Sequence, residues 1–294
     1  MNILVTGSEG NIGKKLIPYL REKGHTVIRN DIVSGIGPDY YQGDISGNDL
    51  YYQDFNDIDV VFHLAAMVSR VTCEITSSLA IHTNICGTNN VCKLCNEIDA
   101  FLINFSTSEV YGNTLDKMTP ESICFPNNRY ALSKYMAEQI VNYEVKYNGL
   151  KAVNVRPFMI YDEDENLGAH RSAMIRFAEA LLKKKKVVVH KGAMRGWLHI
   201  SNAVEILEKI AYTAITGTIN IGNPDVVPVE FIAKLMCMYL ELKPEEYITY
   251  LNLPEQMTLE KNPDLTIQKS LGNISFLEIE KGVKRVLENV RKRI

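Results

Sequence analysis

The feature that most constrains this chain lies in its first 13 residues, where an apolar run leads into three evenly spaced glycines. Residues 3–5 are apolar, Gly7, Gly10 and Gly13 follow, and a helical pattern with one apolar face begins near Asn11. Gly7 permits a tight turn, Gly10 lets the backbone approach a pyrophosphate, and Gly13 lets the helix pack on the strand. We therefore predict a dinucleotide site whose phosphates meet the amino end of the first helix.

A carboxylate follows the second predicted strand, at residues 26–28. Asp31 lies eighteen residues after Gly13, about where an acidic residue binds the ribose 2′-hydroxyl of NAD. Because its charge would repel the 2′-phosphate of NADP, we expect NAD, although the nearby Arg29 weakens this preference. The alternative is a glycine-rich turn without a ligand.

Composition excludes several classes of protein. The chain has 294 residues and a net charge of −3, which argues against a nucleic-acid partner. No segment approaches the roughly 20 apolar residues of a membrane span. The first core strand starts at Asn2 with no signal peptide before it, so we expect a cytoplasmic protein. Cys92 and Cys95 resemble half of a metal site, but with no second ligand pair we expect free thiols and no metal.

Apolar runs alternate with helical patterns along the first half of the chain. Strand-like runs occupy residues 3–5, 26–28, 60–64, 101–105 and 152–155, and helical patterns occupy 11–23, 79–97 and 131–147. This alternation predicts an α/β fold with a Rossmann-type doubly wound parallel sheet. We expect a dinucleotide-binding domain at 1–158, to which 196–222 returns, and a smaller C-terminal substrate-binding lobe at 159–195 and 223–294.

Tyr130 and Lys134 are the main candidates for catalytic residues. They share one face of a predicted helix because they are four residues apart. An ammonium beside a phenol stabilises the phenolate. With a positively charged nicotinamide ring as well, we expect the pKa of Tyr130 to fall from about 10 toward 7, a shift worth about 4 kcal/mol. Such a phenolate is a suitable base for a sugar hydroxyl.

Two further strands end in residues suited to a ligand crevice. The strand predicted at 60–64 runs into the small residues Ala65 and Ala66, and the strand predicted at 101–105 is followed by Thr107, Ser108 and Glu109. The carboxyl ends of parallel strands form the ligand crevice of such a sheet.

In their order and spacing these motifs resemble the extended short-chain dehydrogenase/reductase family, in its NAD-dependent nucleotide-sugar epimerase/dehydratase branch. The resemblance covers nearly the whole chain and includes Gly43-Asp44, Arg156-Pro157-Phe158 and Arg195-x-Trp197-x-His199. It implies that NAD is bound by Gly7, Gly10, Asn11, Ile12, Gly13, Asp31, Asp44, Ile45, Leu64, Ala65, Ala66, Asn84, Tyr130, Lys134 and Pro157. It implies substrate contacts from Thr107, Ser108 and Arg195.

The resemblance also implies the roles of the catalytic residues, which are Thr107, Tyr130, Lys134 and Glu109. Tyr130 would be the base on the sugar 4-hydroxyl, Lys134 would lower its pKa and hold the nicotinamide ribose, and Thr107 would bind the reacting oxygen. Arg195 would bind the nucleotide phosphates. The sugar would pass through a transient 4-keto intermediate while NAD is reduced and reoxidised.

The family divides after that ketone, and we expect 4-epimerisation first. A 4,6-dehydratase and a UDP-glucuronate-type decarboxylase are the alternatives, because Thr107-Ser108-Glu109 resembles the Thr-Ser-Glu run of GDP-mannose dehydratases and UDP-glucuronate decarboxylases. The dTDP-glucose dehydratases have Asp in place of Ser108. Glu109 could instead only cap a turn, and a non-catalytic NAD-binding regulator is a further alternative.

The chain departs from the family pattern at two positions, and the resemblance also carries an expectation about oligomeric state. Met159 replaces the family's Asn, and Asp162 opens an acidic stretch that would repel a diphosphate if it faced the cleft. The family resemblance implies a homodimer built from helices 79–97 and 131–147, although their apolar residues could equally belong to the core of one subunit.

Overall fold

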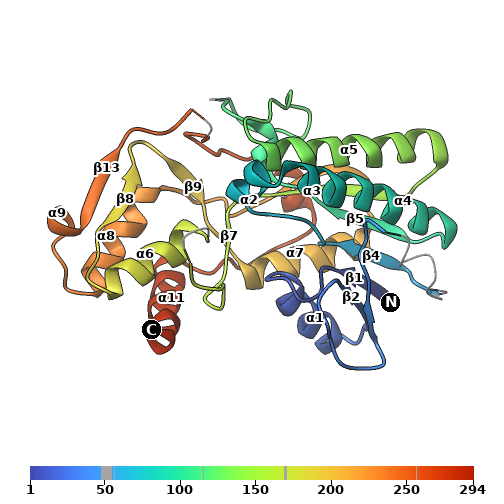
Figure 1. Cartoon of the computed structure of the whole chain (residues 1–294), viewed down its shortest axis with the longest axis horizontal. Helices are drawn as coiled ribbons and strands as arrows, with labels where there is room; N and C mark the ends of the chain where they lie inside the picture. Colours follow the sequence, from blue (N-terminus) through green and yellow to red (C-terminus); the bar gives the residue numbers. More distant parts are fainter. Residues whose placement is uncertain (48–54, 56, 115, 169–170, 256) are drawn as a thin grey trace.

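A seven-stranded parallel sheet forms the centre of the protein (Figure 1). The computed structural model describes residues 1–47, 55, 57–114, 116–168, 171–255 and 257–294. The strands, in the order in which they lie side by side, are β11 (Gly217–Ile221), β6 (Ala152–Pro157), β5 (Phe101–Phe105), β4 (Val60–His63), β1 (Asn2–Thr6), β2 (Thr26–Asp31) and β3 (Tyr40–Gln42). The chain order reverses between β1 and β4, the switch point at which such sheets bind ligands. The predicted doubly wound α/β fold is confirmed.

Helices cover both faces of the sheet, which explains why its central strands β1, β4 and β5 are mostly apolar. On one face, α1 (Gly13–Glu22) and α7 (Ile200–Thr213) pack in a cluster that contains Val5. On the other, α4 (Gly87–Glu97) and α5 (Arg129–Asn148) pack in a cluster that contains Leu4. Figure 1 shows the two pairs of helices on opposite sides of the strands. Successive residues of β1 thus point into different cores.

Short helical segments lead from β4 into α4. They are α2 (Arg70–Ile75), α3 (Ser77–Ile81) and one π-helical turn, η2 (His82–Cys86). Because a π turn contains an extra residue, it changes which side chains face inward, and such turns are frequent at functional sites. Here the turn buries Asn84.

A third hydrophobic cluster lies away from the sheet and contains Trp197 and Tyr161. Its helices are α6 (Ala173–Leu182), α8 (Val229–Tyr239) and α11 (Ile279–Arg293), with α9 (Pro244–Tyr247) beside them and α10 (Thr266–Ser270) nearer the sheet. Three two-stranded pairs complete it: β7 (Ile160–Tyr161) with β10 (Leu198–His199), β9 (Met194–Gly196) with β12 (Val226–Pro228), and β8 (Val187–His190) with β13 (Ile248–Leu251). Figure 1 shows α6, α8, α9 and α11 on the left.

Between the segments that form this third cluster, the chain returns to the sheet. β11 pairs with β6 in parallel, and α7 packs in the same core as α1. The residues expected to return, 196–222, therefore include the seventh strand and one covering helix. No helix within the described residues is long and apolar enough to cross a membrane.

Candidate active site

The glycine-rich loop touches the loop that follows β4, at the switch point of the sheet. Gly7 has a φ of +72°, and a Cβ atom built on it would lie 2.6 Å from the backbone nitrogen of Ala65. A Cβ on Gly13 would lie 2.6 Å from the carbonyl oxygen of Gly7. Because only glycine fits these positions, the loop lies flat across the strand ends and the amino end of α1 stays close to it. This is the cradle that a pyrophosphate requires.

Two buried hydroxyls at the strand ends support the same assignment. Ser8 follows β1 and Ser106 follows β5, and the Oγ atom of each is buried without a hydrogen-bond partner within the described residues. A buried polar atom without a partner is costly. Polar atoms of a bound dinucleotide would satisfy such groups, so the residues present fit the cofactor.

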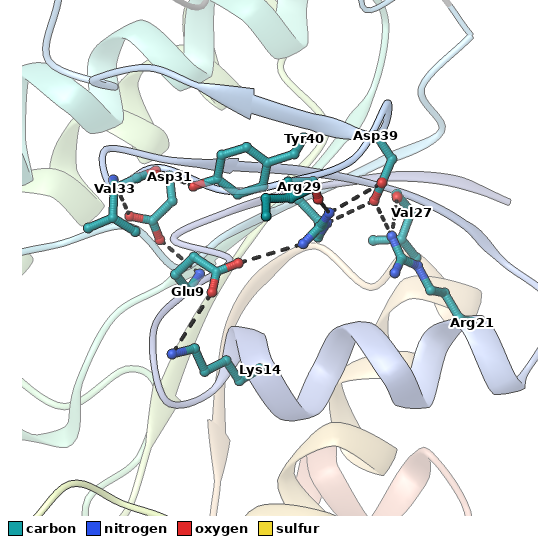
Figure 2. Close-up of polar contacts among 10 residues, drawn as sticks. Glu9, Lys14, Arg21, Val27, Arg29, Asp31, Val33, Asp39 and Tyr40 are labelled. Carbon is teal, nitrogen blue, oxygen red and sulfur yellow. Dashed lines mark hydrogen bonds and ion pairs between the residues drawn. The ribbon is translucent and has the colours of Figure 1, made fainter.

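Asp31 lies at the end of β2 and points toward the glycine-rich loop (Figure 2). Its Oδ2 accepts a hydrogen bond from the backbone nitrogen of Glu9 at 2.9 Å, and its Oδ1 accepts one from Val33 at 3.3 Å. An open pocket next to it is lined by Ile32, Gln42, Gly43 and Asp44. Asp31 and Asp44 therefore lie near one another, and their predicted contacts with NAD stay predictions.

Ile45 and Asn84 serve the scaffold in ways the sequence did not reveal. The side chain of Ile45 is buried against Gly87, where an added Cβ would lie 2.6 Å from it. Asn84 is buried, and its Nδ2 donates to the carbonyl of Met67 and to Ser133 Oγ while its Oδ1 accepts from the Met67 nitrogen. Asn84 thereby joins the loop after β4 to α5. The predicted contacts of Ile45 and Asn84 with NAD stay predictions.

The predicted catalytic residues meet where β5 ends and α5 begins. Thr107 caps the short 3₁₀ helix η3 (Ser108–Tyr111) by accepting a hydrogen bond from the Glu109 nitrogen at 3.2 Å. Asn128 caps α5, so Tyr130 and Lys134 fall in its first two turns. The Tyr130 hydroxyl lies close enough to Thr107 for that side chain to favour its phenolate form. The structure therefore brings Thr107, Tyr130 and Lys134 to one corner.

The protonation states in this corner differ from our expectation. Burial, followed by the charge of Glu109, raises the pKa of Tyr130 above its usual value, whereas we expected a lowered pKa. Burial lowers the pKa of Lys134 to about 8, and the carboxylate of Glu138 opposes this effect. Lys134 is thus mostly an ammonium at neutral pH and Tyr130 a neutral phenol. The full shift toward a phenolate needs positive charge beyond that of Lys134.

A buried ion pair holds α5 against β6 beneath this corner. Arg156 Nε and Nη2 donate to the two carboxylate oxygens of Glu138 at 2.9 and 2.7 Å. Both side chains are almost fully buried, where a bidentate, fully hydrogen-bonded geometry offsets the cost of desolvation. The pair fixes the helix that carries Tyr130 and Lys134.

Glu109 forms the centre of a charged cluster at the carboxyl end of β5. Lys261, which is almost fully buried, forms an ion pair with Glu109 and donates a hydrogen bond to Ser108 Oγ at 3.2 Å. Burial raises the pKa of Glu109, but Lys261, Arg70 and Arg195 outweigh it and bring the pKa to about 2. Glu109 is therefore a carboxylate at neutral pH and is more than the cap of a turn.

Arg195 lies in this cluster, but its guanidinium also supports the chain around Lys261. It donates to the backbone carbonyls of Met194, Leu259 and Thr258, and burial lowers its pKa to about 10. The predicted contact of Arg195 with phosphate stays a prediction. Sequence reasoning missed Lys261 and Arg70, because a lone lysine in a loop and an arginine at a helix start have no distinctive spacing.

The two departures from the family pattern have local explanations. Met159 has a φ of +40°, a left-handed conformation that Asn adopts more easily, so the turn is kept although the residue differs. The acidic stretch at 162–165 is held by its neighbours: Lys15 pairs with Asp162 and Asp164, and His199 Nε2 lies 2.7 Å from Glu163. These contacts tie the stretch to α1 and to the start of α7.

Gly7→Ala tests the glycine cradle. We expect the variant to bind NAD at least about tenfold more weakly, a loss of roughly 1.4 kcal/mol, because the new methyl group must displace the loop after β4. Isothermal titration calorimetry would measure the affinity. Gly149→Ala is the matched control, since Gly149 also has a positive φ (+77°) but nothing within 4 Å of the new Cβ. Equal effects of the two substitutions would contradict the cradle.

Comparisons with known proteins agree with this geometry. Over the whole chain, the sequence is 27% identical to UDP-glucuronic acid decarboxylase 5 of Arabidopsis thaliana, of which it covers 90%. It is 28% identical to the UDP-N-acetyl-alpha-D-glucosaminuronate decarboxylase of Bacillus cytotoxicus, over 79% of this chain and 78% of that protein. The fold matches MoeE5 in complex with UDP-glucuronic acid and NAD with a TM-score of 0.87, at 21% identity and full coverage of both chains. Residues 3–222 match the family described as the NAD dependent epimerase/dehydratase family, and the chain belongs to that family.

Proposed function

We propose that this protein decarboxylates a nucleotide-linked uronic acid, with NAD as cofactor and a 4-keto sugar as intermediate. The observation that carries the proposal is the ion pair between Glu109 and the buried Lys261, next to Thr107 and Ser108. The decarboxylases named above support it, since one matches the whole of this chain and the other 79% of it. This proposal replaces 4-epimerisation, our first expectation from the sequence, with one of its alternatives.

The charge of the cluster supports an anionic sugar. Three cations, Lys261, Arg70 and Arg195, act on one carboxylate, Glu109. The three cations thus outnumber this carboxylate, and a positive site attracts anionic groups. A uronic acid brings a carboxylate in addition to its nucleotide diphosphate, whereas a neutral hexose brings only the diphosphate.

The protonation state of Glu109 argues against a 4,6-dehydratase. That reaction must protonate the departing 6-hydroxyl. Glu109, with a pKa of about 2, carries no proton to give at neutral pH, and Ser108 is an alcohol whose oxygen accepts from Lys261. Decarboxylation has no such leaving group and therefore needs no protonated carboxyl group at position 109.

The remaining roles follow from the placement of each side chain. Thr107 and Tyr130 would hydrogen-bond the oxygen at C4, and Tyr130 would take its proton. NAD, when bound, supplies the oxidant and later the reductant at C4, and a positive ring charge that favours the phenolate. Lys134 adds its ammonium on the same helix face, as expected from the i, i+4 spacing. The glycine loop and Asp31 would hold the pyrophosphate and the adenosine ribose.

Carbon dioxide loss needs only that the electrons of the C5–C6 bond have an acceptor. In a 4-keto uronic acid they pass to the C4 carbonyl and leave an enolate, whose oxygen Thr107 and Tyr130 can stabilise. The enolate then takes a proton at C5. The ammonium of Lys261 is a suitable donor, since burial lowers its pKa and Glu109 keeps it charged.

Product analysis tests the proposal. Purified protein with NAD should convert UDP-glucuronic acid to a product lighter by one carbon dioxide, as read by mass spectrometry, and should leave UDP-glucose unchanged. A product of unchanged mass and altered retention would mean epimerisation instead, and loss of water would mean a dehydratase. The Tyr130→Phe variant should bind NAD but show no turnover. If the unaltered protein converts no member of a wider panel of sugar nucleotides, the alternative of a non-catalytic NAD-binding regulator would be favoured.

The same assay isolates the role of Lys261. Lys261→Met should lower kcat about a hundredfold or more, the usual contribution of a positioned proton donor, with NAD affinity unchanged. Lys261→Arg keeps the charge and should retain more activity than the methionine variant. Full activity of Lys261→Met would remove the main support for the mechanism.

We also propose a homodimer formed through α5 and the neighbouring α3. A stripe on α5 consists of large apolar side chains that face outward, namely Leu132, Met136, Tyr143 and Tyr147, which are 46%, 44%, 56% and 61% exposed. Leu79 and Ile81 of α3 are exposed as well. These residues recur at helical spacing, and contiguous exposed apolar surfaces of this kind mark interfaces. They argue against the alternative that this face of α5 belongs to the core of one subunit.

Sedimentation velocity tests the assembly. The protein should sediment as a dimer, and Leu132→Glu combined with Met136→Glu should convert it to a monomer, because each dimer would bury four unpaired carboxylates. Met238→Glu is the control, since Met238 is 61% exposed on α8, away from the stripe. A monomeric unaltered protein, or a double variant that remains dimeric, would contradict the proposal.

A further inference from the structure

A network of charged side chains surrounds the end of β2, next to the carboxylate of Asp31 (Figure 2). Its centre is Arg29, whose side chain is only 18% exposed. Arg29 Nε donates to Asp39 Oδ2 at 2.8 Å, and Nη2 donates to Asp39 Oδ1 at 3.2 Å and to the carbonyl of Ile36 at 2.6 Å. The guanidinium thus forms a bidentate pair with one carboxylate and binds one backbone oxygen.

The remaining side of Arg29 faces the glycine-rich loop. Its Nη1 lies 3.7 Å from Glu9 Oε1, and the backbone nitrogen of Glu9 donates to Asp31. Lys14 of α1 approaches the other oxygen of Glu9 at 3.9 Å. Glu9 therefore links Arg29 to Asp31 in this chain of contacts, and Arg29 brings a positive charge close to the predicted ribose site.

An arginine in this part of a Rossmann fold is the group that accommodates the 2′-phosphate of NADP. Here that arginine is already paired. Hydrogen bonding and charge from Asp39 raise the pKa of Arg29, and Arg29 in turn lowers the pKa of Asp39. Arg21 of α1 also pairs with Asp39, and the ring of Tyr40 lies 5.0 Å from the Arg29 guanidinium. The side chain is held on several sides.

We propose that Asp39 is a specificity-determining residue for the cofactor: by holding Arg29, it prevents this arginine from binding a 2′-phosphate. Glu9 adds a second carboxylate at the same place. Selection of NAD over NADP then depends on Asp39, Arg29 and Glu9 together with Asp31, and does not depend on Asp31 alone.

The test compares the affinities of NAD and NADP in the Asp39→Asn variant by isothermal titration calorimetry. Asn keeps an acceptor oxygen but removes the charge, so Arg29 becomes available to a phosphate. The ratio of the dissociation constants, NADP over NAD, should fall about tenfold or more, as expected for one new charge-assisted contact. Because binding alone is measured, the result is independent of the sugar chemistry proposed above.

Two further variants assign the effect to Arg29. Asp39→Asn combined with Arg29→Met should restore the ratio of the unaltered protein, whereas a gain made through Arg21 would survive the second substitution and overturn the proposal. Glu22→Gln is the matched control, because Glu22 is an exposed carboxylate on α1 and the net charge changes equally. An equal fall in this control would also overturn it.

A folding defect of Asp39→Asn would not leave the proposal untested. Glu9→Gln removes the other carboxylate that approaches Arg29, and the ratio should fall in the same direction by a smaller factor. Thermal denaturation would establish which variants are folded. A ratio that stays within about twofold of the unaltered value in the folded variants would show that Asp31 alone selects the cofactor.

Discussion

The ion pair between Lys261 and Glu109 joins the end of β5 to a segment near the C-terminus. Glu109 follows the fifth strand of the sheet, and Lys261 comes from a segment 152 residues farther along the chain. An ammonium as deeply buried as that of Lys261 is costly unless it is paired and hydrogen-bonded, and Glu109 and Ser108 supply those partners. Arg195 holds the neighbouring carbonyls in place. The C-terminal segment is thus fixed against the strand end that carries Thr107.

The parallel sheet explains why residues so far apart in sequence meet. All seven strands point the same way, so the loops that follow β1, β4 and β5 emerge at one edge. The glycines keep the first two loops in contact, and the cap at Asn128 places Tyr130 next to Thr107. Most of the predicted site residues therefore lie at one edge of the sheet because of its topology. Charged side chains from other segments of the chain reach the same edge.

The fold and much of the site could be predicted because their signals are local. The strand, glycine turn and helix at the start of the chain lie within about twenty residues, and Tyr130 and Lys134 are paired by the helix repeat alone. The outward orientation of Leu132 and Met136 could not be predicted, since apolar spacing is the same for a core and an interface. The raised pKa of Tyr130 results from burial, which only the folded chain defines.

Contacts between residues far apart in the chain are the other feature that could not be predicted from the sequence. A functional role for Lys261 can be inferred only from its contact with Glu109. In the sequence, Arg29 is a possible phosphate ligand, and only the structure shows that Asp39 binds it. Each of these side chains is of a common type and belongs to no spaced motif. Their roles follow from which neighbours the fold provides, and those neighbours are set by tertiary packing.

In the proposed reaction, carbon dioxide leaves from C5 of the sugar and a proton takes its place. Conversion of UDP-glucuronic acid in deuterium oxide, with the product examined by NMR and mass spectrometry, would follow both events. We expect a pentose nucleotide that carries one deuterium at C5. A product that retains the carboxylate and contains no deuterium would contradict it.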